Sequence, residues 1–224
     1  PTVSVITPTK RPTPCSSCTT RSPTESSEKA SCGRFLCAAA SYTGSMVNYA
    51  ALAKEAEITA PTAKQWLKVL AAAGLVYLLE PFMHPNLKYA VKAPKVYFTD
   101  TGLAAYLLRW SNAEILEAGA MSASFLETWA VMEIYKSFSN CGQVPPLGYY
   151  RDFNSREVEL VLNIDGKVHP LAIRKSSNPA KETKKFDMLQ PVTEGERALQ
   201  LGEGGVICFA TDLLPIRSEE RRVG

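Results

Sequence analysis

Apolar and polar residues alternate with two different periods along the middle of the chain. Between residues 34 and 74 the apolar positions recur at helical spacing and many of them are alanines. Between residues 148 and 175 short stretches alternate with a period of two and are separated by turn-forming residues. The change of period predicts an α+β protein with a helical part followed by a part rich in strands.

The helical part contains start and stop signals. Asn48 and Thr59 each precede an apolar helical pattern, and both residue types are favoured at helix N-caps. Gly74 ends the second pattern, and the apolar strand 75–79 follows it. Two helices joined by a short turn and then a strand predict a helix-turn-helix with a wing, over residues 34–94.

Polar residues on the second of these helices lie opposite its apolar stripe, where recognition residues of a DNA-binding helix would lie: Thr62, Lys64, Gln65 and Lys68. The predicted wing adds three lysines: Lys88, Lys92 and Lys95. A solvated helix face used for protein contacts has the same composition. Sequence therefore leaves DNA contact and a scaffold role both open.

Three successive strands are predicted within residues 148–175. The pair Asp165-Gly166 is a strong signal for a two-residue hairpin between the second and third strands. Strict alternation along the second strand places Val158 and Leu160 on one face and Glu159 on the other. Glu159 is thus a carboxylate in the middle of a predicted sheet.

Two further segments carry candidate functional residues. A short strand precedes Asp100 and Thr101, either of which is expected to cap the helix 102–110, and a metal ligand is the alternative role for Asp100. A second helix is predicted at residues 122–138, with Glu127 off its apolar side and Glu133 on its surface. The residues expected to form its buried stripe are Phe125, Trp129, Met132 and Tyr135.

Several blocks of sequence, in one order, resemble a single protein family. The blocks are NYAALAKEAEITAPTAKQWLKVLAAAGLVYLLEPF, KAPKVYFTDTGLAAYLLRW, SFLETWAVMEIYKS, the hairpin, RKSSNPAKETKKFDML and GGVICFATDLLP. They resemble the C-terminal half of a bacterial and archaeal family of AAA-type ATPases. The resemblance implies a winged helix over residues 34–94, a connecting strand and helix over residues 95–117, and a PD-(D/E)XK restriction-endonuclease-like domain with a mixed sheet over residues 118–216.

The same resemblance implies a nuclease site that has lost required groups. Intact sites hold Mg²⁺ with carboxylates and use a lysine to assist the attacking water. Here Glu127 and Glu159 would supply carboxylates, whereas Ala172 and Arg174 stand where an acidic residue and the lysine are expected. Alanine has no ligand atom, and arginine stays protonated near neutral pH. We therefore expect no catalytic residue, metal ion or cofactor in this chain.

The expected function is a non-catalytic C-terminal accessory module of an AAA-type ATPase. The chain contains no Walker-type loop, so ATP and Mg²⁺ are implied only for a full-length parent. The expected partners are the parent's own ATPase domain, other protomers and DNA, with no membrane contact. The alternatives are a metal-dependent nuclease with a degraded site and a winged-helix DNA-binding regulator.

The ends of the chain differ in composition from the middle. Residues 1–33 are dominated by Ser, Thr and Pro and cannot bury enough apolar surface to offset the entropy of ordering. A disordered linker and non-native sequence from a frame error both explain them, and residues 217–224 resemble a non-native tail. Four of the basic residues lie in the first segment and three in the last, against two acidic residues in each. Because the net charge is +3, the middle is neutral, which does not favour nucleic-acid binding.

Targeting signals are not evident in the sequence. No apolar run reaches the length of a transmembrane helix, and the N-terminal residues lack the apolar core of a signal peptide. The six cysteines are irregularly spaced, which fits reduced thiols better than a disulfide framework. We therefore expect a cytoplasmic protein.

Overall fold

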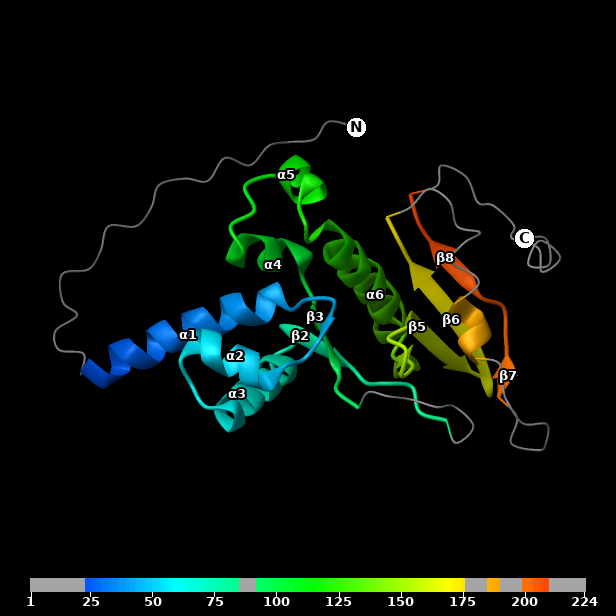
Figure 1. Cartoon of the computed structure of the whole chain (residues 1–224), viewed down its shortest axis with the longest axis horizontal. Coiled ribbons are helices and arrows are strands. Elements are labelled where there is room, and N and C mark those ends of the chain that lie inside the picture. Colours follow the sequence, from blue (N-terminus) through cyan, green and yellow to red (C-terminus); the bar gives the residue numbers. More distant parts are fainter. Residues whose placement is uncertain (1–22, 85–91, 176–184, 190–198, 210–224) are drawn as a thin grey trace.

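A computed structural model of the chain describes residues 23–84, 92–175, 185–189 and 199–209. Most helices gather at one end together with a few short strands, the other strands lie at the opposite end, and one long helix lies between the two groups (Figure 1). The predicted α+β architecture with a mixed sheet is confirmed. Residues 217–224 lie outside the described residues, as does Lys88 of the predicted wing.

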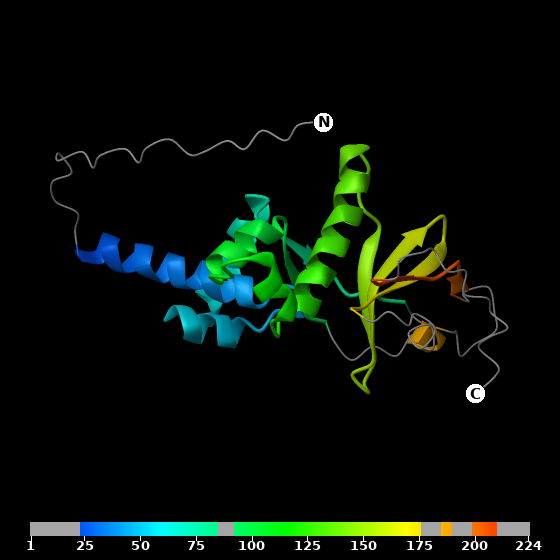
Figure 2. The ribbon, with the colours of Figure 1, turned by 90° about the horizontal axis from the view of Figure 1, so that it is seen from above.

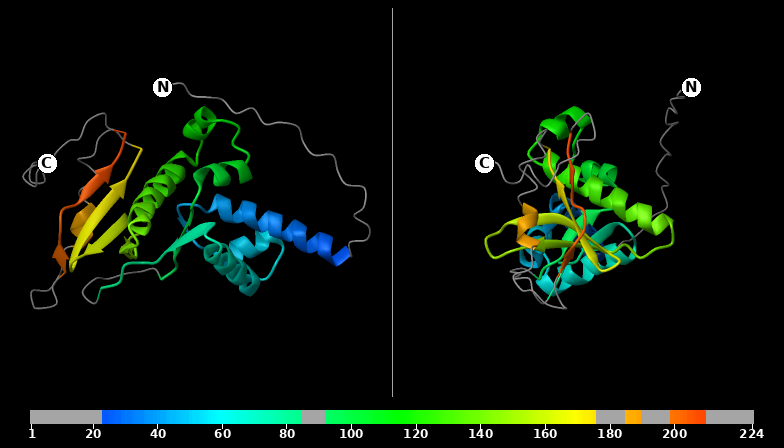
Figure 3. Two further views of the ribbon diagram at one scale, coloured as in Figure 1. Left: turned by 180° about the vertical axis from the view of Figure 1, so that it is seen from behind. Right: turned by 90° about the vertical axis from the view of Figure 1, so that its right-hand side faces the viewer.

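The helical part packs three helices against a small antiparallel sheet, the first sheet, in the strand order β1-β3-β2. Its elements are α1 (Pro23–Ser41), β1 (Ser45–Met46), α2 (Tyr49–Ala56), α3 (Ala60–Ala72), β2 (Val76–Leu79) and β3 (Lys95–Phe98). Three more helices follow, namely α4 (Thr101–Leu107), α5 (Ala113–Ala118) and α6 (Ser122–Asn140). Helix α6 separates the helical part from the remaining strands in two views (Figures 2 and 3).

The helix starts follow the predicted caps. The Asn48 side chain accepts a hydrogen bond from the Ala51 amide at 3.1 Å, and the Thr59 hydroxyl accepts one from the Thr62 amide at 3.3 Å. Each cap satisfies a backbone donor that has no partner within its helix. The predicted starts of α2 and α3 are therefore confirmed.

Helix α1 begins at Pro23, within the segment 1–33 that composition predicted to be disordered or non-native. Proline is well tolerated at the first position of a helix, and Glu28, Lys29 and Ala30 are good helix formers. The helix is anchored at its other end, where Phe35 is buried. The structure thus differs from the prediction for residues 23–33, whereas residues 1–22 lie outside the described residues.

The second sheet combines antiparallel and parallel pairing. Its antiparallel strands β4, β5 and β6 are neighbours in that order, and β6 also pairs in parallel with β7 and β8. The bounds of these strands are β4 (Leu147–Arg151), β5 (Glu157–Ile164), β6 (Lys167–Ile173), β7 (Gln200–Leu201) and β8 (Gly205–Ile207). Asp165 and Gly166 form the predicted hairpin turn, with positive φ angles of 51° and 75°.

A β-bulge interrupts the alternation of β5. The pairing with β4 shifts by one residue between the positions of Val161 and Val158. Val158 consequently packs in the same apolar cluster as Val161, whereas Leu160 belongs to the cluster on the opposite face. The prediction that Val158 and Leu160 share one face is therefore wrong, because strict alternation assumes an uninterrupted ladder.

The buried side of α6 also differs from the prediction. Phe125 and Met132 are buried, but Trp129 is 52% exposed and Thr128 is fully buried in its place. The Thr128 hydroxyl is hydrogen-bonded to the Ser124 carbonyl at 2.7 Å and to the Thr43 hydroxyl at 3.0 Å. These partners remove the penalty of burying a polar group, so the helix can turn its threonine inward.

The two sheets are joined through main-chain bonds beside β4. The Phe82 amide donates to the Tyr149 carbonyl at 2.6 Å, and the Tyr149 amide donates to the Glu80 carbonyl at 3.2 Å. Side chains from the first sheet, Leu79 and Tyr97, pack in the apolar cluster that α6 forms with the second sheet. The helical part and the second sheet therefore share a core.

The capping role of Asp100 at the start of α4 can be tested by substitution. The Asp100 carboxylate accepts hydrogen bonds from the amides of Gly102 at 2.7 Å and Leu103 at 3.1 Å. Replacing it by alanine (Asp100→Ala) is expected to lower the free energy of unfolding by about 1 kcal/mol. Asp100→Asn keeps an acceptor and should lose much less. Urea denaturation of both variants checks this, and equal losses would contradict the capping role.

Candidate functional site

A cavity of about 770 Å³ lies where the helical part meets the second sheet. The segment from the end of α1 through β1 forms one wall, and the others are formed by residues of β3, α6, β4 and β5, by the turn between β4 and β5, and by Arg174 and Lys185 beyond β6. Its lining is strongly charged. The carboxylates are Glu127, Glu157 and Glu159, and the cations are Lys95, Arg151, Arg156, Arg174 and Lys185.

Lys95 is a buried ammonium shared by two of these carboxylates. Only 2% of the residue is exposed. Its Nζ donates to Glu157 Oε1 at 2.6 Å and also to Glu127 Oε1. Burial by itself lowers the pKa of Lys95, but the charges of Glu127 and Glu157 outweigh burial, and the pKa is raised above its ordinary value. Lys95 is therefore charged at neutral pH.

Further donors complete this ion-paired group. The Tyr97 hydroxyl donates to Glu127 Oε1 at 2.7 Å, and Arg151 pairs with Glu157 Oε2 at 3.2 Å. Burial, followed by the charge of Glu127, raises the pKa of Tyr97 well above its ordinary value. The hydroxyl therefore stays protonated and can only donate to Glu127 near neutral pH.

Sequence reasoning missed the burial of Lys95. We expected it to be one of three lysines offered by the wing, of which Lys92 is indeed exposed. Lys95 opens β3, in which every residue is buried. A lysine followed directly by the apolar run Val-Tyr-Phe was the available signal, because a charge at the start of a fully buried strand needs a partner.

Glu159 forms the second ion-paired group of the cavity. The residue is 1% exposed, and its Oε1 pairs with the Arg174 guanidinium and lies 3.8 Å from Lys185 Nζ. Its Oε2 is buried and has no hydrogen-bond partner among the described residues. Burial raises the pKa of Glu159, and the nearby charges of Arg174 and Lys185 only partly oppose this.

The structure brings together three of the four positions at which the resemblance implied a nuclease site. Glu127, Glu159 and Arg174 all line the cavity. Ala172 is instead fully buried in an apolar cluster with Phe186 on one face of the second sheet. Glu133, expected on the surface of α6, is exposed and pairs with Lys136 at 2.9 Å.

The carboxylates of the cavity already have cationic partners. Lys95 lies between Glu127 and Glu157, and Arg174 contacts Glu159. Among the residues that the structure describes, no group of three or more His, Cys, Asp or Glu side chains is placed to hold a metal ion. A divalent ion would have to displace these cations to reach the oxygens. The charged side chains that line the cavity are suited to contact charged groups of a bound molecule.

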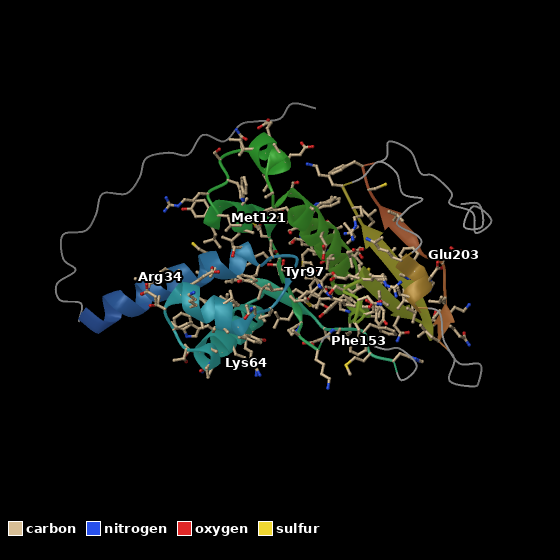
Figure 4. The ribbon with its side chains drawn as sticks, in the orientation of Figure 1. Arg34, Lys64, Tyr97, Met121, Phe153 and Glu203 are labelled. Carbon is tan, nitrogen blue, oxygen red and sulfur yellow. The ribbon has the colours of Figure 1, made fainter. Side chains whose placement is uncertain are left out.

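The residues considered for DNA contact lie elsewhere. Lys64, Gln65 and Lys68 are exposed on α3, and Thr62 is half-buried beside Thr59. Figure 4 shows Lys64 at the edge of the helical part, away from the centrally placed Tyr97 that donates to Glu127. Thus the surface of α3 and the cavity are separate features.

Comparison with known proteins divides the chain into two matched segments. Residues 23–114 match a family described as a domain of unknown function (DUF8612), and residues 123–220 match another (DUF4143). The chain is 26% identical over 141 residues to the uncharacterized protein Mb2031c of Mycobacterium bovis and to the uncharacterized protein Rv2008c of Mycobacterium tuberculosis. Each alignment covers 63% of this chain and 31% of the relative, so the match spans less than a third of each relative's length.

No solved structure gives a significant match to the chain. Within the described ranges, no helix combines the length and apolar character needed to cross a membrane.

Removing the buried ammonium should strongly destabilise the protein. Lys95→Met leaves Glu127 and Glu157 close together and mostly buried without their shared cation, which is expected to cost about 3–5 kcal/mol. Lys136→Met removes an exposed lysine from a surface pair and should cost well under about 1 kcal/mol. Urea denaturation of both variants tests this difference, and similar losses would show that Lys95 is not a stabilising partner.

The raised pKa of Glu159 predicts a pH dependence of stability. Because the folded state holds this proton more tightly than the unfolded chain, the stabilisation is complete below pH 4.5 and is lost as the pH rises through the raised pKa. Glu159→Gln cannot titrate, so its stability relative to the natural chain should increase over this interval. Denaturation series from about pH 4 to about pH 8 test the trend, with Glu133→Gln as the exposed control. A stability difference that is constant with pH would contradict it.

Proposed function

We propose that this chain is a non-catalytic accessory region of an AAA-type ATPase, in which a winged helix is followed by a restriction-endonuclease-like domain. In this proposal the nuclease-like cavity does not hydrolyse a substrate. Its ion pairs hold the helical part and the second sheet together, and the cavity serves as a binding site. Support comes from the sequence blocks that resemble this family, from the two matched domains in one chain and from the much greater length of the relatives.

The arrangement of the helical part supports a winged helix. Helices α2 and α3 are joined by a short turn, and β2 and β3 then pair as antiparallel strands with β1 on the other side of β3. This is the order of elements in a helix-turn-helix with a wing. The segment 85–91 that would form the tip of the wing lies outside the described residues.

The arrangement of the second sheet supports a relationship to the nuclease fold. Glu159 lies on β5, flanked by the antiparallel strands β4 and β6, and Arg174 follows directly after β6. Helix α6 covers one face and carries Glu127. The positions of these two carboxylates, on a helix and on a middle strand, support the resemblance.

The observation that carries the non-catalytic assignment is the occupation of these carboxylates by cations of the chain. Hydrolysis assisted by Mg²⁺ requires oxygen ligands that the ion can approach with near-octahedral geometry. Here Lys95 forms ion pairs with both Glu127 and Glu157, and Arg174 forms an ion pair with Glu159. A buried, paired lysine with a raised pKa cannot accept a proton from water near neutral pH.

Incubation of the full chain with duplex and single-stranded DNA tests this assignment. No cleavage is expected with Mg²⁺ or Mn²⁺, and no thermal stabilisation beyond that of a control with matched ionic strength. Cleavage by the natural chain that is lost in Glu159→Gln would contradict the proposal. Restoring both nuclease-type residues is a weaker test, because Ala172→Glu would place a carboxylate in an apolar cluster.

A second candidate function, DNA binding by the winged helix, is favoured by the exposed Lys64, Gln65 and Lys68 on α3. If it is correct, duplex DNA should bind at low salt, and the double variant Lys64→Gln/Lys68→Gln should reduce the slope of log affinity against log salt by about 2. Lys136→Gln, on α6, is the matched control. Absence of binding at low salt would eliminate this candidate.

The link to an ATPase has a test of its own. Sequencing the gene through the codons for residues 1–34 and upstream should find a Walker motif in frame or joined by a frame error. An intact reading frame without such a motif would contradict the link, and would leave a two-domain protein for which the DNA-binding candidate becomes the stronger one.

A further inference from the structure

The carboxylate of Glu159 has one oxygen with partners and one without. Its Oε1 pairs with the Arg174 guanidinium and lies 3.8 Å from Lys185 Nζ. Its Oε2 is buried and has no hydrogen-bond partner among the residues that the structure describes. An acceptor left unpaired in the interior is unfavourable, and nearly all such groups in proteins find a partner. Oε2 therefore needs a hydrogen-bond donor that the described part of the chain does not supply.

The two cations beside Glu159 do not fully compensate its charge. Burial raises the pKa of Glu159, and the nearby charges of Arg174 and Lys185 only partly oppose this effect. Both cations pair with Oε1. A donor that reached Oε2 would therefore stabilise the charged carboxylate further.

Glu159 lies at the wall of the cavity, from which a donor can approach it. The residue is on β5 and contributes to the lining, although only 2% of its side chain is exposed. The side chains of Arg174 and Lys185 also line the cavity and are 35% and 29% exposed. Side-chain rotamer changes are common at binding surfaces. We therefore expect a ligand to contact Oε2 after a side-chain rotation at this wall.

The charges around the cavity favour a neutral ligand. Each cation of the lining has a carboxylate partner: Lys95 pairs with Glu127 and Glu157, Arg151 with Glu157, Arg156 with Asp152, and Arg174 and Lys185 with Glu159. An anion would have to compete with these carboxylates. A cation would enter a lining that, among the described residues, has five cations and three carboxylates. A neutral donor meets neither obstacle.

We propose that the cavity binds a neutral ligand that carries an N–H donor, and that Glu159 Oε2 accepts the hydrogen bond from it. The ligand class is a primary carboxamide or an amino-substituted heterocycle, because both present a neutral, planar N–H group. This inference rests on the proposed function, since it assigns a ligand to the binding role of the cavity and requires that the cations remain paired.

Other parts of the lining fit a ligand of this kind. The volume of about 770 Å³ is within the range of small-molecule sites. Carboxamides and amino-heterocycles carry acceptors close to the amino group, and the hydroxyl groups of Ser41, Ser45 and Ser155 are available in the lining as donors. Tyr42 and Met46 add apolar surface at the wall formed by the end of α1 and β1.

Glu159→Gln separates the role of Oε2 from that of Oε1. A glutamine side chain has one acceptor oxygen and one amino group. Because the Arg174 guanidinium can only donate, the acceptor oxygen is expected to turn toward Arg174, and the amino group then takes the place of Oε2. A ligand donor would face a second donor there, so its advantage should disappear while the shape of the side chain is kept.

The experiment is an NMR titration of the full chain, at constant ionic strength, with two matched pairs of compounds. Benzamide and cytidine carry the amino group. Acetophenone, which has a methyl group in its place, and the analogue of cytidine without its amino group do not. In at least one pair the compound with the amino group should bind about tenfold or more tightly, as expected for a hydrogen bond to a carboxylate. The pair that responds distinguishes a carboxamide from an amino-heterocycle.

In Glu159→Gln the two members of that pair should bind equally. Glu133→Gln is the matched control, because it changes an exposed carboxylate of α6 outside the cavity and should keep the difference. If Glu159→Gln does not fold, the backbone amide signals of β5 in the natural chain replace it. These signals should shift with the amino compound and not with its partner.

Several outcomes would overturn this inference and leave the accessory function standing. They are equal binding within both pairs, a difference that persists in Glu159→Gln, and tighter binding of the cationic benzamidine than of benzamide. Thermal stabilisation by Mg²⁺ that is lost in Glu159→Gln would instead assign Oε2 to a metal ion. Together with cleavage of DNA that requires Mg²⁺, it would overturn both the inference and the proposed function.

Discussion

The buried ammonium of Lys95 is the constraint on which the rest of the structure depends. It belongs to the first sheet, but its partners Glu127 and Glu157 belong to α6 and to the second sheet. Loss of the ammonium while the elements stay packed would leave two carboxylates mostly buried without compensation, which is strongly unfavourable. The rings of Tyr97 and Tyr149 lie 5.8 Å and 5.7 Å from the ammonium and surround it with further favourable contacts.

The same interaction gives the cavity its chemical character. A carboxylate that stabilises a buried cation is not available as a metal ligand, so the structural role of Glu127 opposes the role that the resemblance implies for its position. Arg174 extends this pattern to Glu159. The carboxylates of the cavity are thus paired with cations of the chain, and this is why a binding role is proposed.

Local signals in the sequence were sufficient for much of the fold. Asn48 and Thr59 as caps, and Asp165-Gly166 as a turn, act through bonds and backbone angles within a few residues, so sequence alone predicted them. The errors involve contacts between distant residues. The inward position of Thr128 depends on Thr43, and the pairing of Lys95 depends on residues more than thirty positions away. For the site, Glu127, Glu159 and Arg174 were identified by resemblance, but the pairing of Lys95 with Glu127 and Glu157 was not.

The backbone pairing of residues 80–82 with β4 has a consequence for how the chain can be divided. An outer strand of a sheet offers unpaired amides and carbonyls to any neighbouring chain, and the segment after β2 occupies part of that edge at Tyr149. The two matched families meet between residues 114 and 123, but this cover and Lys95 both come from the first of them. A chain divided between the two matched families would therefore leave the second segment with an uncovered edge at β4 and with Glu127 deprived of Lys95 and Tyr97.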